Sequence, residues 1–597
     1  NLLPVSTKNN ETNKDEEEEI EETSNEIFEE LKGNAYRSFV LGEDIDKEFK
    51  FGELVEPPTN IVASNPKNQL ISIPVTMELK DESGGFTYKP QGFKVIDKTG
   101  KEYSMIDMNV TEKGNWMNKF DLRSPSKTSV ILTYEVPKAE SHYLLLARVA
   151  ALPGDYVAEI HVLENAQRTE TINPGVSGEY ILDVKLDEEN RFHISAEIDV
   201  MNESQDTWKD IGFYFIPNAF TSENKPDFIK DEADFSINQI TVNDEEIPYD
   251  LTNNKLLLKL NNDLLPGEKK KVNIQYTLEI PENGARLSKV DDNFYLAQWY
   301  PMLGHYQKGW NIKDFDVKGE SYHTSYGDYV VNYELPKDYL VVSSGQDNQI
   351  QPTSSGTIEG VNIKDFYLSL LNPSEWTSKS AMVNDTNLRM FLPSDGPDFS
   401  EEMAKSAVEA YAYFESNLGD NPFHELDIIG NGGNMEYPNV IEVSNISQNF
   451  ENSLVHEIAH QWFYYMVSND PHKEAWLDEG LTEFVTSMYL TEKYNESIGY
   501  EFASNLTQGN STSDIVNKSL NEFERSEYVS TVYGKTPLLL RDFFNEHGGQ
   551  EEALKFLSEY FKAYKFKYVD SKIFADFLNE YFEEDTNEFL EEWLVLD

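Results

Sequence analysis

The chain has 597 residues, of which 39% are hydrophobic and 26% charged, and this apolar content excludes wholesale disorder. Fifty Lys and Arg residues oppose 107 Asp and Glu residues, so the formal net charge of −57 argues against nucleic acid as a partner. Cys is absent, which excludes disulfides, thiolate nucleophiles and Cys-based zinc sites.

Residues 1–35 are predicted to form an acidic disordered tail. Between Glu11 and Glu30, eleven of twenty residues are Asp or Glu, and like charges without an apolar face cannot build a core. The sequence has no apolar run near the roughly 18 residues that span a membrane. Because the chain begins at Asn1 rather than Met, we expect a processed N-terminus, with a removed signal or anchor as an open alternative.

Residues 36–165 and 166–393 are predicted to be two β regions. Both contain short runs rich in β-branched residues, separated by Gly and Pro turns: 70–79, 128–136, 180–186, 193–200, 271–278 and 329–335. The first region resembles, in pattern, the immunoglobulin-like β-sandwich modules of surface lipoproteins from Gram-positive bacteria. That resemblance implies a secreted or cell-envelope protein, with a cytoplasmic location as the alternative. For 166–393 we expect a large, mainly antiparallel β domain.

Residues 394–597 are predicted to be mainly helical. Apolar residues recur three and four positions apart in 403–414, and a short strand is expected at 426–429. The predicted fold class is therefore multidomain, with N-terminal β-sandwich modules followed by a mainly helical α+β domain.

The sharpest motif is the run from His456 through Glu457 to His460. Residues four apart share one face of a helix, so the two imidazoles can reach one zinc ion. Glu457 is offset by one position and can face a water molecule beside the metal as a general base. The alternative is an amphipathic helix with two surface histidines. We predict one zinc ion per chain and a metallopeptidase.

A catalytic zinc site needs a third protein ligand. One known pattern places a third His six residues after the second, with a Gly between, but Phe463 and Met466 occupy those positions. The other pattern takes a Glu from a second helix, and Glu479 follows His460 after eighteen intervening residues.

These motifs resemble the zinc aminopeptidases, such as aminopeptidase N and leukotriene hydrolase, which are gluzincins. Their hallmark is His-Glu-x-x-His, eighteen residues and then Glu, often within Trp-Leu-x-Glu-Gly. The resemblance covers roughly residues 170–597, includes 298–301 and 319–323, and lacks the family's long C-terminal helical domain. It implies a thermolysin-like catalytic domain over residues 394–597 that removes N-terminal residues from a peptide substrate, with His456, His460 and Glu479 as zinc ligands.

The resemblance also implies several further roles near the metal. Glu483, one turn beyond Glu479, is expected to hydrogen-bond the first zinc His, and a solvated acid is the alternative. The family's Gly-x-Met-Glu-Asn strand corresponds to 433–437, so Gly433 and Glu436 are expected to bind substrate, with Glu436 anchoring the free α-amine. Tyr437 replaces the usual Asn.

The resemblance also indicates which residues bind the substrate's amine and which residue stabilises the oxyanion. Gln298 matches a substrate-binding Gln of the family, whereas Tyr300 stands where many members carry a second amine-binding Glu. Tyr533, just before a helical run, matches the family's oxyanion donor, and Tyr528 is the fallback. Two alternatives stay open: a zinc endopeptidase, and a catalytically silent surface binding protein derived from a peptidase.

Overall fold

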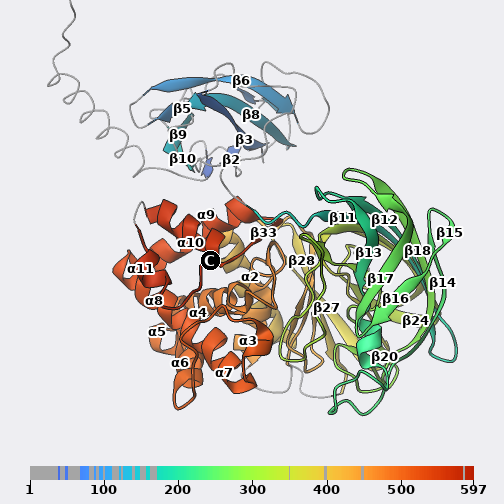
Figure 1. Cartoon of the computed structure of the whole chain (residues 1–597). Coiled ribbons are helices and arrows are strands. Elements are labelled where there is room, and N and C mark those ends of the chain that lie inside the picture. The colour runs from blue at the N-terminus through green and yellow to red at the C-terminus, as the bar shows by residue number, and fades with distance from the viewer. Residues whose placement is uncertain are drawn as a thin grey trace, which may run out of the picture. The chain divides into compact units, whose positions relative to one another are not determined.

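The chain divides into two compact units, Asn1–Thr169 and Glu170–Asp597 (Figure 1). The computed structural model describes residues 38–40, 47–51, 67–79, 86–88, 93–97, 101–110, 120–122, 126–137, 142–147, 156–161, 171–347, 350–395, 400–444, 450–582 and 585–596. The acidic tail predicted for residues 1–35, and the boundary predicted between 165 and 166, lie outside the described residues.

The described part of the first unit consists of β-strands. They are β1 (Ser38–Val40), β2 (Lys47–Phe51), β3 (Asn68–Leu79), β4 (Phe86–Tyr88), β5 (Phe93–Asp97), β6 (Glu102–Val110), β7 (Phe120–Leu122), β8 (Ser126–Pro137), β9 (His142–Ala147) and β10 (Tyr156–His161). The sheet order is β1-β2-β3-β8-β6-β5-β9-β10, and β4 pairs with β7. Ile71, Ile73 and Val75 of β3 are buried, and so is Ser72 between them, whose hydroxyl hydrogen-bonds that of Thr133 at 2.8 Å. The predicted β character is confirmed, while the immunoglobulin-like type stays a prediction.

The second unit begins with a large, mainly antiparallel β region. Its strands are β11 (Val176–Leu186), β12 (Phe192–Asn202), β13 (Trp208–Tyr214), β14 (Asp234–Val242), β15 (Glu245–Glu246), β16 (Tyr249–Thr252), β17 (Lys255–Leu264), β18 (Lys269–Glu279), β19 (Leu287–Val290), β20 (Asn293–Leu296), β21 (Met302–Leu303), β22 (His305–Tyr306), β23 (Trp310–Asn311), β24 (Gly327–Ser343), β25 (Thr353–Ile363) and β26 (Leu368–Leu371). A ten-stranded sheet has the order β15-β14-β18-β12-β11-β24-β26-β20-β19, with β25 paired to β24. A four-stranded sheet, β16-β17-β13-β21, accompanies it.

A five-stranded sheet links this β region to the helices. It comprises β27 (Trp376–Val383), β28 (Thr386–Pro393), β29 (Glu425–Ile429), β30 (Met435–Tyr437) and β31 (Val440–Glu442) in the order β27-β28-β29-β31-β30. In Figure 1 the yellow β27 and β28 lie between the green strands and the orange and red helices. Because β28 pairs in parallel with β29, the boundary predicted between 393 and 394 falls inside this sheet.

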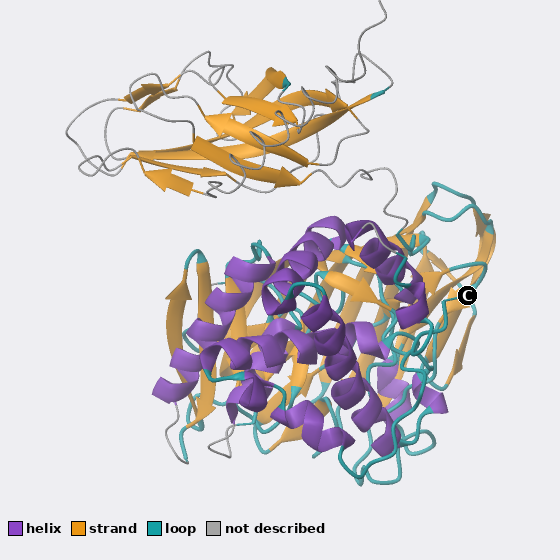
Figure 2. Cartoon of the chain, turned by 90° about the vertical axis from the view of Figure 1, so that its left-hand side faces the viewer, coloured by secondary structure: helices purple, strands orange, loops and turns teal. Residues whose placement is uncertain are grey.

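The helices of the second unit gather on one side of its strands (Figure 2). They are α2 (Ser400–Leu418), α3 (Phe450–Ala459), α4 (Leu481–Lys493), α5 (Glu496–Gly499), α6 (Glu501–Thr507), α7 (Arg525–Val529), α8 (Thr536–Glu546), α9 (Gly549–Tyr564), α10 (Ser571–Phe582) and α11 (Asn587–Leu590). Two π-helical turns, Trp476–Gly480 and Ser530–Lys535, precede α4 and α8, and the parallel strands β32 (Val467–Asn469) and β33 (Lys567–Val569) pair with each other. Across the described residues, no helix combines the length and the apolarity needed to cross a membrane.

Candidate metal centre

Helix α3 and the turn after it carry the two histidines of the motif. The helix ends at Ala459, but the His460 backbone N–H still donates to the His456 carbonyl at 3.2 Å, so the spacing of one helical turn is kept. Both imidazoles are buried, because α3 packs in the interior with Leu454 and Ile458 fully buried. The two rings therefore face the same point.

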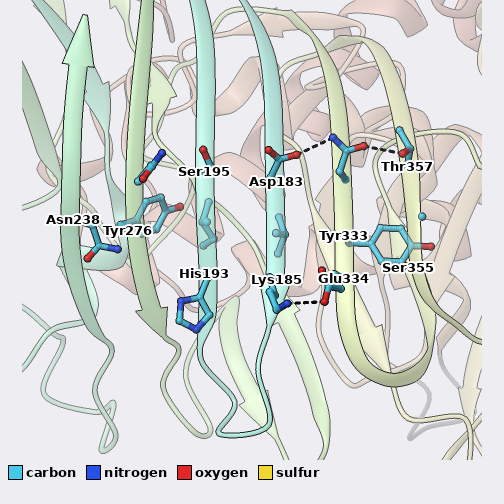
Figure 3. A pocket seen from close by; sticks show the side chains of 15 residues that line it. Asp183, Lys185, His193, Ser195, Asn238, Tyr276, Tyr333, Glu334, Ser355 and Thr357 are labelled. Atoms are coloured by element: carbon cyan, nitrogen blue, oxygen red, sulfur yellow. Dashed lines mark hydrogen bonds and ion pairs between the residues drawn. The ribbon is translucent and has the colours of Figure 1, made fainter. Parts of the chain in front are cut away.

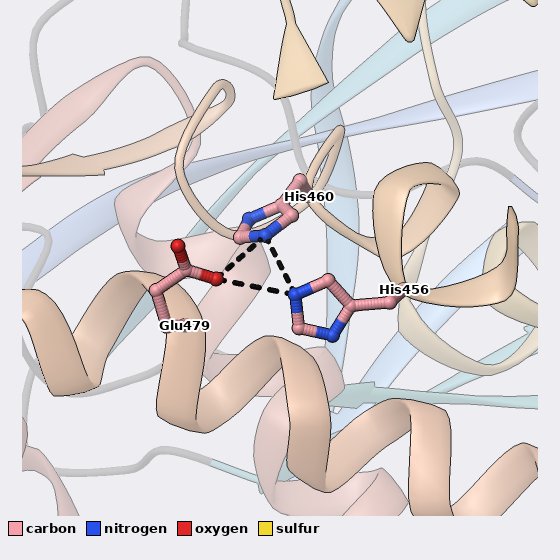
Figure 4. A group of neighbouring side chains, drawn as sticks. All are labelled: His456, His460 and Glu479. Atoms are coloured by element: carbon pink, nitrogen blue, oxygen red, sulfur yellow. Dashed lines mark hydrogen bonds and ion pairs between the residues drawn. The ribbon is translucent and has the colours of Figure 1, made fainter. Parts of the chain in front are cut away.

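The third member of the group comes from the π-helical turn Trp476–Gly480. Oε2 of Glu479 lies 3.1 Å from Nε2 of His456 and 3.1 Å from Nε2 of His460, and the two Nε2 atoms are 3.1 Å apart (Figure 4). Three potential ligand atoms thus converge from two elements that are far apart in sequence.

This convergence fits a zinc ion. Ligands about 2.0–2.1 Å from a tetrahedral zinc are separated by about 3.3 Å, close to the three distances found here. Glu436 completes two further groups with ligand atoms within 4.8 Å, one with Glu457 and His460 and one with Asp478 and Glu479. Those groups contain two or three carboxylates, whereas zinc prefers the two imidazoles and single carboxylate of the first group.

The second nitrogen of each imidazole is also engaged. Nδ1 of His456 lies 3.0 Å from Oε2 of the fully buried Glu483. Nδ1 of His460 lies 3.0 Å from Oδ1 of Asp478 and 3.1 Å from the Phe463 carbonyl. Acceptors at Nδ1 orient each ring so that its Nε2 is free for a metal, and they raise its basicity.

Glu457 lies beside this group on α3. Its side chain is buried, and Oε2 has no hydrogen-bond partner among the described residues. Burial raises the pKa of Glu457 to about 7, although the neighbouring His456 and His460 act in the opposite direction. A carboxylate with a pKa near neutrality can both accept and return a proton.

Two tyrosines form one wall of the centre. Tyr533, in the π-helical turn Ser530–Lys535, stacks on His456 with the ring centroids 5.8 Å apart. Burial raises the pKa of Tyr533 well above its usual value, and the charge of Glu479 adds to this effect. Tyr528 of α7 packs edge-on against Tyr533, with the centroids 5.9 Å apart, and is more deeply buried. Of the two rings, that of Tyr533 is the one that stacks on a member of the metal group.

Strand β30 carries Glu436, a further buried carboxylate beside the metal group. Glu436 pairs with Ile441 of β31 and is 4% exposed, and its Oε1 has no hydrogen-bond partner among the described residues. Burial raises the pKa of Glu436 well above its usual value, and Glu320 adds to this effect more than any other charge. Gly433, at the start of this segment, lines a pocket of about 860 Å³ together with Arg286.

Gln298 and Tyr300 lie inside the β region. The buried side chain of Gln298 donates to the Tyr322 hydroxyl at 3.0 Å, and Tyr322 lies 3.2 Å from the hydroxyl of Tyr464, whose ring packs on His460. Tyr300 is fully buried, and its hydroxyl accepts from the Phe366 backbone N–H at 2.9 Å. Tyr300 is therefore a core residue.

Three residues of the centre escaped the sequence reasoning: Asp478, Glu320 and Arg286. Asp478 is next to Glu479, but nothing in its type marked it as a partner of His460. Glu320 lies in a segment that resembles the zinc aminopeptidases, and Arg286 comes from a turn 34 positions earlier, to which Glu320 is joined by an ion pair. That pairing is visible only in three dimensions.

A larger pocket, of about 900 Å³, lies away from these residues on β11, β12, β14, β18, β24 and β25 (Figure 3). Polar groups that line it have partners: Lys185 forms an ion pair with Glu334 at 2.6 Å, and the Asn332 amide donates to the Asp183 carboxylate at 2.8 Å. No predicted site residue lines it, so it contributes nothing to the metal centre.

Comparison with known proteins identifies the class of the helical part. Residues 435–593 match the Peptidase family M1 domain. Leucine aminopeptidase 2-1 of Meyerozyma guilliermondii is 30% identical over 167 residues, which are 25% of this chain and 27% of that protein. Aminopeptidase B of Rattus norvegicus is 28% identical over 143 residues, 22% of each chain. The match thus spans about a quarter of the length of these curated relatives.

Solved structures extend the likeness to the fold of the second unit. The M1 zinc metallopeptidase of Deinococcus radiodurans has a TM-score of 0.51 at 14% identity over 70% of this chain and 93% of that one. A two domain M1 zinc metallopeptidase mutant with bound L-tryptophan has a TM-score of 0.51 at 14% identity, and the match covers 71% of this chain and 95% of that one. Native yeast LTA4 hydrolase has a TM-score of 0.51 at 16% identity, and the match covers 70% of this chain and 66% of that one. The match of residues 435–593 to the M1 peptidase domain confirms the resemblance to the zinc aminopeptidases, and the solved structures show that the second unit shares their fold.

Proposed function

We propose that the protein is a zinc-dependent aminopeptidase, which hydrolyses the N-terminal residue from peptides. The observation that supports this most is the convergence of His456, His460 and Glu479 at 3.1 Å beside two buried carboxylates, Glu457 and Glu436. When bound, zinc supplies Lewis-acid chemistry: it polarises the scissile carbonyl and acidifies a water molecule.

The chain's own residues then have distinct tasks. Glu457 accepts a proton from the attacking water, whose oxygen bonds to the carbonyl carbon. The same carboxyl later gives that proton to the departing nitrogen as the C–N bond breaks. The Tyr533 hydroxyl donates a hydrogen bond to the oxyanion that develops on the carbonyl oxygen. Glu436 holds the substrate's α-ammonium group, so cleavage occurs after the first residue.

The test combines zinc content with hydrolysis of matched substrates. Purified protein should contain about one zinc per chain, chelation should abolish hydrolysis, and His456→Ala should lose most of the zinc. Aminoacyl p-nitroanilides should be cleaved at least a hundredfold better, in kcat/KM, than their N-acetylated versions, because acetylation removes the charge that Glu436 recognises.

Each alternative predicts a different result. Equal rates on free and acetylated substrates would indicate an endopeptidase. Bound zinc without hydrolysis of any peptide would indicate a binding protein derived from a peptidase. Full zinc occupancy in His456→Ala would exclude the ligand set itself.

A further inference from the structure

Tyr464 has a backbone conformation that is unusual for a residue with a side chain. Its φ is 109°, whereas the other non-glycine residues with positive φ in the described part of the chain lie between 48° and 65°, near the left-handed well. At 109° the Cβ of a bulky residue is crowded by the backbone, which costs free energy. Tyr464 is 1% exposed and its ring packs edge-on against His460, so this strain lies beside the metal group.

The φ angle of Tyr464 decides where the Phe463 carbonyl points. That carbonyl belongs to the planar peptide group before Tyr464, so rotation about φ turns it as a rigid unit. In the observed conformation the Phe463 oxygen lies 3.1 Å from Nδ1 of His460. Asp478 approaches the same nitrogen, and two acceptors fix the plane of the ring more narrowly than one. A relaxed, negative φ would turn the Phe463 carbonyl away from the imidazole.

Lys364 holds Tyr464 at two points. Its Nζ donates to the Tyr464 carbonyl at 3.3 Å and lies 3.9 Å from the centroid of the Tyr464 ring. An ammonium group over an aromatic face is attracted to it, and the attraction is stronger when the pair is desolvated, as here, where Lys364 is 1% exposed. The backbone of Lys364 is itself fixed, because the Thr324 hydroxyl donates to its carbonyl at 2.6 Å.

The hydroxyl of Tyr464 is a third point of attachment. It donates to Oδ1 of Asp365 at 3.3 Å and lies 3.2 Å from the Tyr322 hydroxyl. Lys364 and Asp365 directly follow β25, so the β region grips both ends of this side chain and its carbonyl. Contacts from a separate part of the fold thus offset the strain at a residue that follows the metal-binding helix.

We propose that Lys364 and Tyr464 are positioning residues of the metal centre. Lys364 holds Tyr464 at its positive φ, and Tyr464 thereby directs the Phe463 carbonyl to His460. The proposal rests on the zinc site of the proposed function but not on which peptide bond is cut. Neither residue has to touch the substrate, so the effects are expected in metal affinity and in the geometry of the bound ion.

The experiment compares the zinc affinities of full-length variants, measured in competition with a chromophoric chelator. Cobalt-substituted protein supplies a second readout, because the visible absorption of bound Co²⁺ responds to the geometry of its ligands. Neither readout depends on turnover. Circular dichroism and a cooperative thermal transition establish that each variant is folded.

Lys364→Met keeps the length of the side chain and removes the ammonium group. It should lower the zinc affinity by about tenfold and shift the cobalt absorption bands. Lys565→Met is the matched control, because Nζ of Lys565 also donates to a backbone carbonyl, that of Asp420 at 2.7 Å, and lies over the Phe561 ring. This control should leave both readouts unchanged.

Glycine and alanine at position 464 test the strain itself. Both variants remove the ring, but only glycine adopts a φ of 109° without a steric cost. Tyr464→Gly should therefore bind zinc about fivefold or more tightly than Tyr464→Ala. Equal affinities would show that the φ of this residue does not direct the Phe463 carbonyl, and would overturn the proposal.

A double variant separates this route from a direct electrostatic one. Burial lowers the pKa of Lys364, while carboxylates such as Asp365 and Asp478 act in the opposite direction, so its charge is also coupled to the centre without Tyr464. If Lys364 acts through Tyr464, Lys364→Met should change the zinc affinity by less than about threefold in the Tyr464→Gly background.

The same tenfold loss in both backgrounds would assign the effect of Lys364 to its charge and overturn the proposal. A loss below threefold for Lys364→Met in the wild-type background would overturn it as well. A wild type that binds no zinc would instead refute the metal centre of the proposed function, and the positioning role with it.

Discussion

At the scale of single residues, the centre is made of groups whose charges depend on one another. Glu457 is buried beside two imidazoles and near Glu479, and burial dominates, so its pKa rises to about 7. A carboxylate in bulk water has a pKa near 4 and would be a weaker base at neutral pH. The protein environment therefore prepares Glu457 for proton transfer.

Glu457→Gln tests this role directly. The amide has the same shape but cannot accept a proton, so kcat should fall by about 10²–10⁴-fold. Zinc content should remain near one per chain, because Glu457 is not among the three converging ligands. Steady-state kinetics with metal analysis measures both quantities, and a variant within threefold of wild type would contradict the assignment.

The two tyrosines give a matched pair of variants. Tyr533→Phe removes the hydroxyl of the ring that stacks on His456 and should lower kcat by about 10²-fold, the effect of losing one oxyanion donor. Tyr528→Phe, five residues earlier and more deeply buried, should change kcat by less than tenfold. The reverse order of effects would assign the oxyanion contact to Tyr528.

The sequence alone predicted those site residues that lie close together in space because of their spacing along the chain. His456 and His460 are one turn apart on a helix, so their pairing follows from local geometry. The ion pair of Arg286 with Glu320 joins segments 34 positions apart that share no motif, and nothing in the type of Asp478 marked it as a partner of His460. Such contacts depend on tertiary packing, which a single sequence does not display.

At the scale of elements, both segments that complete the centre are π-helical turns. Trp476–Gly480 carries Glu479, and Ser530–Lys535 carries Tyr533. A π-turn widens the helix by one residue and redirects its side chains, and such turns concentrate at functional sites. The sequence placed Glu479 on a second helix and Tyr533 just before a helical run, but it could not indicate the extra residue in either turn.

Gly480 allows the two π-turns to pack closely, and Gly480→Ala tests this contact. Its φ of −69° suits any residue, but a Cβ would lie 2.7 Å from Cγ2 of Thr536. Alanine should therefore separate Glu479 from Tyr533, lower kcat/KM by about tenfold and destabilise the protein by about 1–3 kcal/mol.

The companion variant Thr536→Ser is the control for that prediction. Serine removes Cγ2 but keeps the hydroxyl that donates to the Thr531 carbonyl at 3.1 Å. The double variant Gly480→Ala/Thr536→Ser should recover most of the lost activity and melting temperature. Failure to recover either would show that the glycine serves another purpose.

The raised pKa of Glu474 predicts that the stability of the protein depends on pH. Glu474 lies just before the first π-turn and accepts a hydrogen bond from Ser571, the first residue of α10. Burial raises its pKa from an ordinary value of 4.5 to about 7, although the Ser571 hydroxyl acts in the opposite direction. The folded protein therefore holds this proton more tightly than the unfolded chain. Its contribution to stability is complete below about pH 4.5 and is lost as the pH rises through 7.

Glu474→Gln mimics the protonated form at every pH. Its melting temperature should match that of wild type near pH 5 and exceed it by a few degrees near pH 8, as thermal denaturation can measure. Glu334→Gln, in an exposed ion pair with Lys185, is the control and should show no such divergence. An equal difference at both pH values would contradict the raised pKa.

At the scale of the whole molecule, the sequence predicted the change from strands to helices better than the limits of the folded parts. Composition shifts from β-branched runs to helical periodicity near residue 394, and within the described part of the second unit the first α-helix is α2, which begins at Ser400. The sheet that carries Glu436 nevertheless recruits β27 and β28 from before that point. Strand pairing between segments far apart in sequence decides such limits. The proposed location outside the cytoplasm stays a prediction.

The last prediction concerns which part of the chain suffices for activity. Every residue placed at the centre, from Arg286 to Tyr533, belongs to the unit Glu170–Asp597, which has its own sheets, helices and buried core. The two domain M1 zinc metallopeptidase with a similar fold matches 71% of this chain and 95% of its own length. A unit with its own core is expected to fold independently.

Residues 170–597 expressed alone should therefore bind one zinc and cleave aminoacyl p-nitroanilides with a kcat/KM within threefold of the full chain. The same fragment with Glu457→Gln is the control for contaminating peptidases. Circular dichroism and a cooperative thermal transition should establish that the fragment is folded before its activity is compared. A folded, zinc-loaded fragment with a tenfold lower kcat/KM would show that Asn1–Thr169 takes part in binding or turnover, because no other part of the chain would have been removed.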